Sequence, residues 1–247
     1  MTANQENALV FEGMVSLRAL IAGRKRKIEK VLYAESRKEK NVKEYAFLRH
    51  RAEEGLFELV LCPKEEIDGI APSRTHGGVI ALCKERVYPS LPGKLPENGF
   101  YVMTEGIEDP FNFGYALRSL YAAGADGVIL ASGVRTGADG TVCRSSAGAS
   151  ERMEICLSKP EDAVSFFRSQ GYKIVCADLP DSVPVYDADL KKPLLLIVGG
   201  EKRGISRPVL DACDATVRLE YGREFDAALS AASAASILAF EVYRQNR

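Results

Sequence analysis

The segment from Asp109 to Arg118 places an amide, a glycine and an arginine at the junction of a predicted strand and a predicted helix. It reads Asp-Pro-Phe-Asn-Phe-Gly-Tyr-Ala-Leu-Arg, with apolar residues 101–103 before it and a helical pattern over residues 116–123. Asn112 is expected at or near the N-cap, where its side chain can accept a hydrogen bond from a free backbone N–H. Arg118 is expected not far from the positive end of the helix, an arrangement that favours phosphate binding. A capped helix with an ordinary surface arginine is the other interpretation of this segment.

Two later segments also carry candidate functional groups. Residues 194–198 form an apolar run that predicts a strand, and Gly-Gly-Glu-Lys-Arg-Gly follows it from Gly199 to Gly204. The glycines would let a ligand approach backbone donors closely, and Glu201 could hold an arginine through charge-assisted hydrogen bonds. An exposed glutamate on a plain turn is the alternative. Further on, Ala-Leu-Ser at 228–230 lies within a helix predicted over Ala227–Arg244.

Near-continuous apolar strands alternate with helices over the C-terminal part of the chain, which predicts a parallel sheet covered on both faces. Ligands of such sheets bind beyond the carboxyl ends of the strands, where the segments above lie. The predicted strands are Tyr101–Thr104, Gly127–Ala131, Glu154–Leu157, Lys173–Ala177, Leu194–Val198 and Ala215–Leu219. The predicted helices are Asn112–Ala123, Glu161–Gln170, Pro208–Ala212 and Ala227–Arg244.

A smaller α/β domain is predicted in the N-terminal part. The proline-rich residues 87–98 exclude a regular helix or a central strand and indicate a linker, so we expect domains at residues 1–86 and 99–247. In the first domain, the pattern predicts helices at Ser16–Ala22 and Lys43–Glu54 and strands at Ile28–Tyr33, Phe57–Cys62 and Gly78–Leu82.

The motif segments resemble, in order and spacing, those of the SpoU (TrmH-type) branch of the SPOUT methyltransferases. Residues 109–118 match the first family motif, Asp-Pro-x-Asn-x-Gly-x-x-x-Arg, at every specified position, and residues 199–204 match the second, Gly-x-Glu-x-x-Gly. The resemblance implies an enzyme that transfers methyl from S-adenosylmethionine to a ribose 2′-hydroxyl of RNA, with ribosomal RNA as the expected substrate. It also implies a C-terminal trefoil knot, a homodimer formed through the knot region, and an N-terminal RNA-binding domain that resembles a ribosomal protein.

The family roles carry over to matching positions. Arg118 matches the arginine beside the substrate phosphate, Asn112 matches the asparagine that helps to orient this group, and Glu201 matches the glutamate of the second motif. The family's cofactor-binding positions correspond to Gly199, Leu219 and Leu229. Without the resemblance, both leucines would be assigned to the core. No Gly-x-Gly-x-x-Gly follows a strand, which counts against a Rossmann-type cofactor site.

The third family motif is altered. Its usual Ser-Leu-Asn is Ala-Leu-Ser here, so Ser230 is a shorter substitute for the asparagine among the expected catalytic residues, and Ala228 lacks a hydroxyl. The usual Ile-Pro-Met is Leu-Glu-Tyr at 219–221, without the stiffening proline. Lost hydrogen bonds of this kind cost about 1–3 kcal/mol each. The alternative function is therefore a weakened or inactive RNA-binding or ribosome-assembly protein that keeps the fold.

Clustered cations indicate where RNA would bind. The clearest run is Arg24-Lys25-Arg26-Lys27, for which a solvated charged face is the alternative. Arg135 and Arg144 form a second candidate, which resembles the family loop that faces the active site. The small side chains of residues 231–236 suit a tight knot or a dimer interface, and packing within one domain is the alternative.

Composition excludes several other protein classes. The net charge of −1 over 247 residues means that RNA contact would depend on a local patch. No apolar run is long enough to span a membrane, and the N-terminus does not resemble a signal peptide, so we expect a cytoplasmic protein. The six cysteines are scattered and are expected to be buried free thiols. With only two histidines, the chain offers little for a zinc site, and no metal is predicted.

Overall fold

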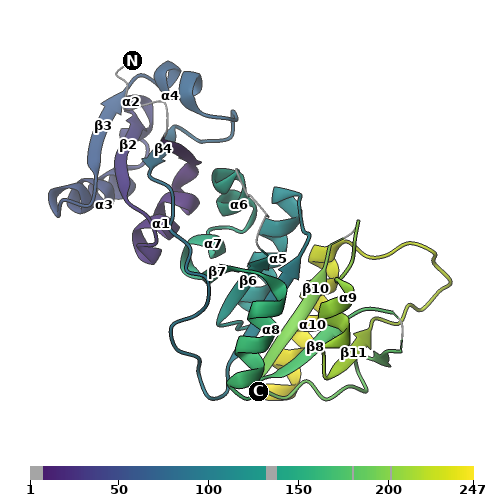
Figure 1. Ribbon diagram of the computed structural model, residues 1–247. Coiled ribbons are helices and arrows are strands. Elements are labelled where there is room, and N and C mark those ends of the chain that lie inside the picture. Colours follow the sequence, from purple (N-terminus) through teal and green to yellow (C-terminus); the bar gives the residue numbers. More distant parts are fainter. Residues whose placement is uncertain (1–7, 132–137, 180, 201) are drawn as a thin grey trace. The chain divides into compact units, whose positions relative to one another are not determined.

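The computed structural model describes residues 8–131, 138–179, 181–200 and 202–247 (Figure 1). The chain divides into two compact units, each with its own sheet. Unit 1 comprises Met1–Val87 and Ala138–Arg152, and unit 2 comprises Tyr88–Gly137 and Met153–Arg247. The first and third motif segments and the described part of the second all belong to unit 2.

Unit 2 is built on a seven-stranded sheet in which every neighbouring pair is parallel. The order is β7-β6-β5-β10-β8-β11-β9, so the strands that precede the first and second motifs, β5 and β10, are direct neighbours. Their register pairs Val198 with Thr104 and Gly199 with Glu105. The strands are β5 (Phe100–Glu105), β6 (Gly127–Ala131), β7 (Glu154–Ser158), β8 (Lys173–Ala177), β9 (Val183–Pro184), β10 (Leu194–Gly199) and β11 (Ala215–Arg218).

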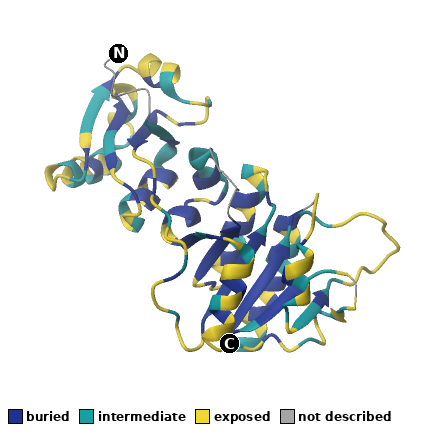
Figure 2. Ribbon diagram, viewed as in Figure 1, coloured by how far each residue is buried: buried dark blue, intermediate teal, exposed yellow. Residues whose placement is uncertain are grey.

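Helices cover both faces of this sheet, which confirms the predicted α/β architecture (Figure 1). On one face, α8 (Pro160–Ser169) and α9 (Arg207–Asp211) enclose a buried cluster that includes Met103, Phe167 and Ile197. On the other face, α5 (Pro110–Ala122) packs against α10 (Ala231–Asn246). The central strand β10 is buried along Leu194–Val198 (Figure 2), as its continuous apolar sequence predicts. The short strand β9 was not predicted.

Unit 1 contains a mixed four-stranded sheet in the order β1-β4-β2-β3. β2 and β3 are parallel, and the other pairs are antiparallel. The strands are β1 (Leu9–Glu12), β2 (Ile28–Ala34), β3 (Glu58–Cys62) and β4 (Val79–Cys83). The helices are α1 (Gly13–Gly23), α2 (Glu35–Lys38), α3 (Val42–Glu53), α4 (Lys64–Ile70), α6 (Asp139–Ser145) and α7 (Ala149–Arg152). The predicted helices and strands all form, while β1 and the short helices α2 and α4 were not predicted.

The segment Ala138–Arg152 packs with unit 1, although the predicted C-terminal domain included it. Small residues make this packing possible. A Cβ added at Gly140 would lie 2.2 Å from the carbonyl oxygen of Val10, and one added at Gly23 would lie 1.7 Å from that of Glu151. Cys143 joins the buried cluster of unit 1. Helix periodicity could not reveal this packing, because α6 and α7 are too short to show it.

Arg26 lies inside unit 1, where its guanidinium is fully engaged. Its Nε and Nη2 donate to the two carboxylate oxygens of Glu151 at 2.9 and 3.0 Å, and its Nη1 donates to Asp139 at 3.0 Å. The guanidinium also lies 4.7 Å from the ring centroid of Phe11. Burial alone would lower the pKa of Arg26, but the hydrogen bonds and charge of Glu151 raise it above its ordinary value. The prediction that Arg26 contacts RNA is therefore wrong.

Arg26 lies at a bend in the short connection between α1 and β2, so neighbouring residues of the basic run do not share one face. Arg26 and Ile28 are buried, whereas Lys25 and Lys27 are exposed. The run of four cations is thus a two-sided segment rather than a continuous positive surface.

All six cysteines are free, and all except the half-buried Cys213 are buried. Burial raises the pKa of the Cys83 and Cys143 thiols to about 12, so both are protonated and unreactive at neutral pH. Among the described residues, no helix is both long and apolar enough to cross a membrane. The same residues contain no group of three or more potential metal ligands.

The buried ion pair predicts a stability effect. Arg26→Met would leave the Glu151 carboxylate, whose side chain is 2% exposed, without its partner. Removing one member of a buried pair costs about 3–5 kcal/mol, so we expect a loss of that size in the free energy of unfolding, measured by urea denaturation. Lys25→Met, at the exposed neighbour, should change it by less than about 0.5 kcal/mol. Equal stabilities of the two variants would contradict this description of Arg26.

Candidate functional site

The first motif begins α5, with Asp109 rather than Asn112 at the N-cap. The Asp109 side chain accepts a hydrogen bond from the Asn112 backbone N–H at 2.7 Å, and Pro110 occupies the first turn. Asn112 therefore lies near the N-cap, as expected, but the capping side chain is that of Asp109. Asn112 lies in the first turn of α5, beyond the carboxyl end of β5.

The second motif forms a tight loop against the first. Gly200 N–H donates to the Glu105 carbonyl oxygen at 2.6 Å, and Gly204 N–H returns to the Gly200 carbonyl oxygen at 3.0 Å. A Cβ added at Gly200 would lie 2.0 Å from the Gly106 oxygen, so only glycine allows this approach. Glu201, the predicted catalytic glutamate, lies outside the described residues. Its neighbour Lys202 forms an exposed ion pair with Glu108 at 2.7 Å.

The third segment is a loop followed by α10, which begins later than predicted. Residues 219–229 contain no helix or strand, and α10 starts at Ala231 rather than at Ala227. Ser230 is the N-cap, and its Oγ accepts a hydrogen bond from the Ser233 N–H at 3.2 Å. The Ser230 hydroxyl thus caps the start of α10. Ser230 lines neither of the two cavities described next.

A cavity of about 270 Å³, which we call cavity A, lies at the carboxyl ends of β8, β10 and β11. It brings together the three positions expected to bind cofactor, Gly199, Leu219 and Leu229. Most of the remaining wall is apolar or backbone. It is completed by Ala177, Asp178, Leu179, Val198, Gly200, Gly204, Val217, Arg218, Tyr221, Ala228, Ala231, Ala234 and Leu238.

The polar residues of cavity A were not predicted as site residues. Asp178 follows β8 directly, and its Oδ1 accepts a hydrogen bond from the Leu179 N–H at 2.7 Å. Arg218 forms an ion pair with Glu220 at 2.9 Å and donates to the Ser182 carbonyl oxygen. The rule that ligands bind beyond the ends of parallel strands could have indicated Asp178. The same rule applies to Arg218, which ends β11, and Tyr221 belongs to the altered triplet at 219–221.

A second and smaller cavity of about 100 Å³, cavity B, contains Asn112. Its other lining residues are Gly106, Ile107, Glu108, Asp109, Lys202 and Ala231. Ala231 lines both cavities, and the Gly106–Gly200 approach lies between the two loops that form them. The first and second motifs therefore meet at adjoining hollows, one mainly apolar and the other lined by an amide and charged groups.

Arg118 is exposed and lines neither cavity. It forms no hydrogen bond or ion pair with any residue that the structure describes. Its spacing along α5 places it on one face of the helix with Phe111 and Tyr115, which are 44% and 50% exposed. The structure thus places Arg118 on a free helical face and does not bring it to Asn112 within cavity B.

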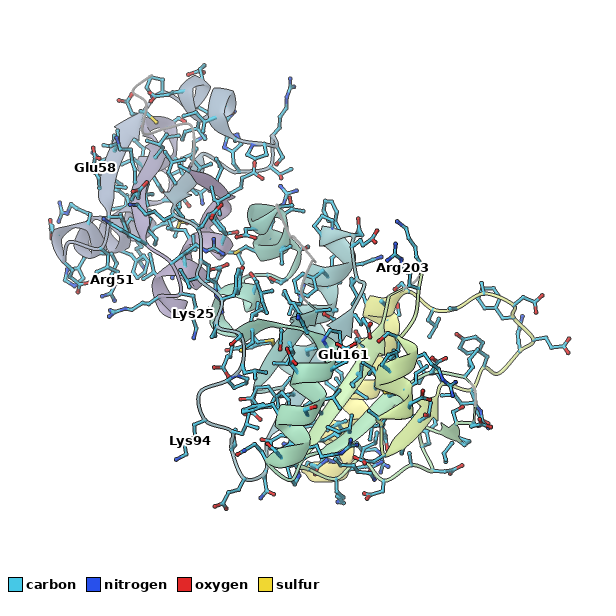
Figure 3. The ribbon with its side chains drawn as sticks, in the orientation of Figure 1. Lys25, Arg51, Glu58, Lys94, Glu161 and Arg203 are labelled. Carbon is cyan, nitrogen blue, oxygen red and sulfur yellow. The ribbon has the colours of Figure 1, made fainter. Side chains whose placement is uncertain are left out.

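The candidate RNA-binding cations have different surroundings. Arg24, Lys25 and Lys27 are exposed, and Lys25 projects from unit 1 just after α1 (Figure 3). Arg144 donates to Glu12 at 3.0 Å and to Ser73 at 2.7 Å, so its charge is largely satisfied within unit 1. Arg135 lies outside the described residues. Arg203, which was not predicted, is exposed on the loop after β10 (Figure 3).

The chain is similar to known RNA methyltransferases. A protein of Staphylococcus haemolyticus assigned to the TrmH family tRNA/rRNA methyltransferases is 29% identical over 190 residues, which cover 74% of this chain and 76% of that protein. The crystal structure of an AdoMet-bound rRNA methyltransferase from Sinorhizobium meliloti matches 98% of this chain and 88% of its own, with 25% identity and a TM-score of 0.81.

A further solved structure has the same fold. The SpoU methyltransferase AviRb from Streptomyces viridochromogenes, in complex with AdoMet, gives a TM-score of 0.80 at 22% identity over 98% of this chain and 92% of its own. Residues 99–240, which span β5 to the middle of α10, match the SpoU rRNA Methylase family. The chain therefore belongs to the SpoU rRNA Methylase family.

Proposed function

We propose that this protein transfers the methyl group of S-adenosylmethionine to a ribose 2′-hydroxyl of ribosomal RNA, using cavity A for the cofactor and cavity B for the reacting nucleotide. The observation that carries the proposal is the convergence of Gly199, Leu219 and Leu229 on one cavity that adjoins the Asn112 cavity. Both hollows lie at the carboxyl ends of parallel strands, where such sheets bind ligands. The Sinorhizobium meliloti structure is named an rRNA methyltransferase, and the Staphylococcus haemolyticus relative is named a tRNA/rRNA methyltransferase, which supports an RNA substrate of this class.

We propose that cavity A binds S-adenosylmethionine through the chemistry of its lining. Gly199 and Gly200 allow close backbone packing beside the cavity, because a Cβ at either position would collide with the backbone of Gly204 or Gly106. Leu219, Leu229 and Leu238 offer apolar contact to an adenosine and a methionine chain, and Asp178 offers a negative charge to a cationic sulfonium or ammonium group. When bound, the cofactor supplies an electrophilic methyl group.

The residues of the chain would then act by positioning. A ribose hydroxyl is a weak nucleophile at neutral pH, so its placement and the removal of its proton limit the reaction. We propose that Asn112 orients the nucleotide in cavity B and that Arg118 holds the adjacent phosphate. Arginine keeps its proton at neutral pH, so the role of Arg118 is electrostatic. Glu201 is proposed to orient an arginine, and Ser230 to act through the start of α10.

We also propose that unit 2 is knotted. The supporting observation is that the wall of cavity A is formed by three strand ends together with the loop 219–229 and α10, the last helix of the chain. Gln245 and Asn246 at the end of α10 bind the segment before β10. The Gln245 Oε1 accepts from Leu190 N–H at 2.9 Å, and the Asn246 Nδ2 donates to the Leu190 carbonyl at 3.0 Å.

The rival function is RNA binding without methyl transfer. It is favoured by one specific observation, the use of the Ser230 hydroxyl as a helix cap in place of the family asparagine. It is opposed by the convergence of Gly199, Leu219 and Leu229 on cavity A, which RNA binding alone does not require.

Methyl transfer decides between these functions. Purified protein with S-adenosylmethionine carrying a labelled methyl group should label ribosomal RNA, and the label should be recovered as 2′-O-methylnucleoside after digestion. Arg118→Ala should lower the rate at least about 100-fold, since lost charge stabilisation at a reacting centre typically costs that much. Arg207→Ala, at an exposed arginine on α9 that lines neither cavity, is the matched control. Cofactor binding without transfer to any RNA would favour the rival function.

We propose that Arg24, Lys25 and Lys27 form part of the RNA surface of unit 1. The supporting observations are their exposure and the burial of Arg26 between them. Phosphate contacts by exposed lysines release counterions and make binding depend on salt.

Removal of two of these charges should change the salt dependence of RNA binding. Lys25→Ala/Lys27→Ala is expected to reduce the slope of log affinity against log salt by about 2, measured by filter binding to total ribosomal RNA. The control Lys64→Ala/Arg74→Ala removes the same charge from another part of unit 1. If both pairs alter the slope equally, the effect is one of net charge and not of this surface.

We propose a homodimer formed through α5 and α10. The two helices meet where Ser236 Oγ donates to Ser119 Oγ at 2.6 Å. On either side of this bond, Phe111 and Tyr115 of α5 and Phe240 and Tyr243 of α10 are each 44–50% exposed. An apolar surface of this kind typically marks an interface. Arg118 belongs to the same face, so dimerisation would bring it to the surface of another copy.

A charge placed in this surface should prevent association. Tyr115→Glu/Phe240→Glu is expected to be monomeric at protein concentrations where the wild type is dimeric, because two like charges would be buried at a symmetric contact. Light scattering after size exclusion measures the mass. Val42→Glu, at another exposed apolar residue, should remain dimeric. A monomeric wild type would exclude the dimer.

A further inference from the structure

One wall of cavity A is a loop with little structure of its own. Residues 219–229 connect β11 to α10 without any helix or strand, yet Leu219, Tyr221 and Leu229 from this loop line the cavity. A loop of this length samples many conformations unless it is tied together. The shape of the cavity therefore depends on whatever joins the two ends of the loop.

A single tyrosine joins them. The Tyr221 hydroxyl accepts a hydrogen bond from the Leu229 backbone N–H at 3.1 Å. In the described loop, this is the only hydrogen bond between residues 219–222 and residues 226–229. The Tyr221 ring also contacts Phe225 in the tip of the loop, at 6.2 Å between ring centroids. The ion pair of Arg218 with Glu220 constrains only the start of the loop, close to β11.

The position of this bond is informative. Tyr221 and Leu229 both line cavity A, so the bond crosses the loop at the wall of the cavity itself. It also satisfies a backbone N–H, because Leu229 lies outside α10 and has no helical partner. The Tyr221 hydroxyl accepts this bond and still has its own proton to donate.

We propose that Tyr221 is a positioning residue that holds the cofactor wall of cavity A closed through its bond to Leu229. The inference rests on the proposed function, since it assumes that cavity A binds S-adenosylmethionine. Tyr221 makes a local closure that a rigid residue, such as proline, would otherwise provide. If the cavity is closed for only part of the time, its apparent affinity for the ligand equals the affinity of the closed form multiplied by the fraction of time it is closed.

Tyr221→Phe removes only the hydroxyl and keeps the ring contact with Phe225. A neutral hydrogen bond contributes enough free energy that its loss should weaken cofactor binding about three- to ten-fold. Calorimetric titration of S-adenosylmethionine into the purified full chain measures this directly. In methyl transfer, the KM for the cofactor should rise by the same factor while kcat and the KM for RNA stay unchanged, which general destabilisation would not produce.

A matched control is available on α5. Tyr121 is 43% exposed, and its hydroxyl has no hydrogen-bond partner among the described residues. Tyr121→Phe should bind the cofactor like the wild type. Hydrogen exchange without cofactor gives a second readout, because the Leu229 amide should exchange about three- to ten-fold faster in Tyr221→Phe, with an unchanged melting temperature.

The outcomes separate the inference from the function on which it rests. Equal cofactor affinity and equal Leu229 exchange in wild type and Tyr221→Phe would overturn the role of Tyr221 and leave the proposed function intact. A wild type that binds no cofactor at millimolar concentration, while its Leu229 amide is protected by Tyr221, would overturn the proposed function and with it the cofactor role of this bond.

Discussion

The close approach of two backbones, at Gly106 and Gly200, is the contact on which the rest of the site depends. The Gly200 N–H lies 2.6 Å from the Glu105 carbonyl oxygen, and a methyl group at Gly200 would have to lie 2.0 Å from the Gly106 oxygen. The approach is possible because β5 and β10 are neighbours in register, with Gly199 opposite Glu105. If these loops separated, cavities A and B would lose their common boundary. The sheet order therefore determines that the two motif loops meet, and the glycines determine how closely.

The strands, α5 and the loop 219–229 each contribute a different part of the site. The strands supply backbone groups and fixed positions at their carboxyl ends, α5 supplies Asn112, and the loop 219–229 supplies the least constrained wall. The rigid parts of the site thus come from the buried core, where Leu194–Val198 are almost fully enclosed. The adjustable part depends on one hydrogen bond. Ligand affinity in such a site is sensitive to the loop, whereas ligand placement is a property of the sheet.

Much of the architecture of unit 2 follows from the sequence, because long apolar strands and glycine turns are strong local signals. Gly127–Ala131 and Lys173–Ala177 form the predicted strands to the residue. The predictions failed where a distant contact decides the outcome. Nothing local in Arg24–Lys27 shows that Arg26 meets Glu151, 125 positions along the chain. Asn112 and Asp109 are both good N-caps, and the local signal that favours Asp109 is Pro110 at the first helical position. The late start of α10 likewise follows from the cap at Ser230, since a run of alanines carries no start signal of its own.

The packing of Ala138–Arg152 with unit 1 has a topological consequence. The chain leaves one unit for the other after Val87, after Gly137 and after Arg152, so unit 1 is discontinuous in sequence. A single cut in the proline-rich segment would not release it, and a truncation at residue 87 would strip Val142, Cys143 and Ala149 of the surfaces that bury them. The N-terminal part is consequently not an interchangeable module. Exchanging it for another domain would require matching changes in the segment between β6 and β7.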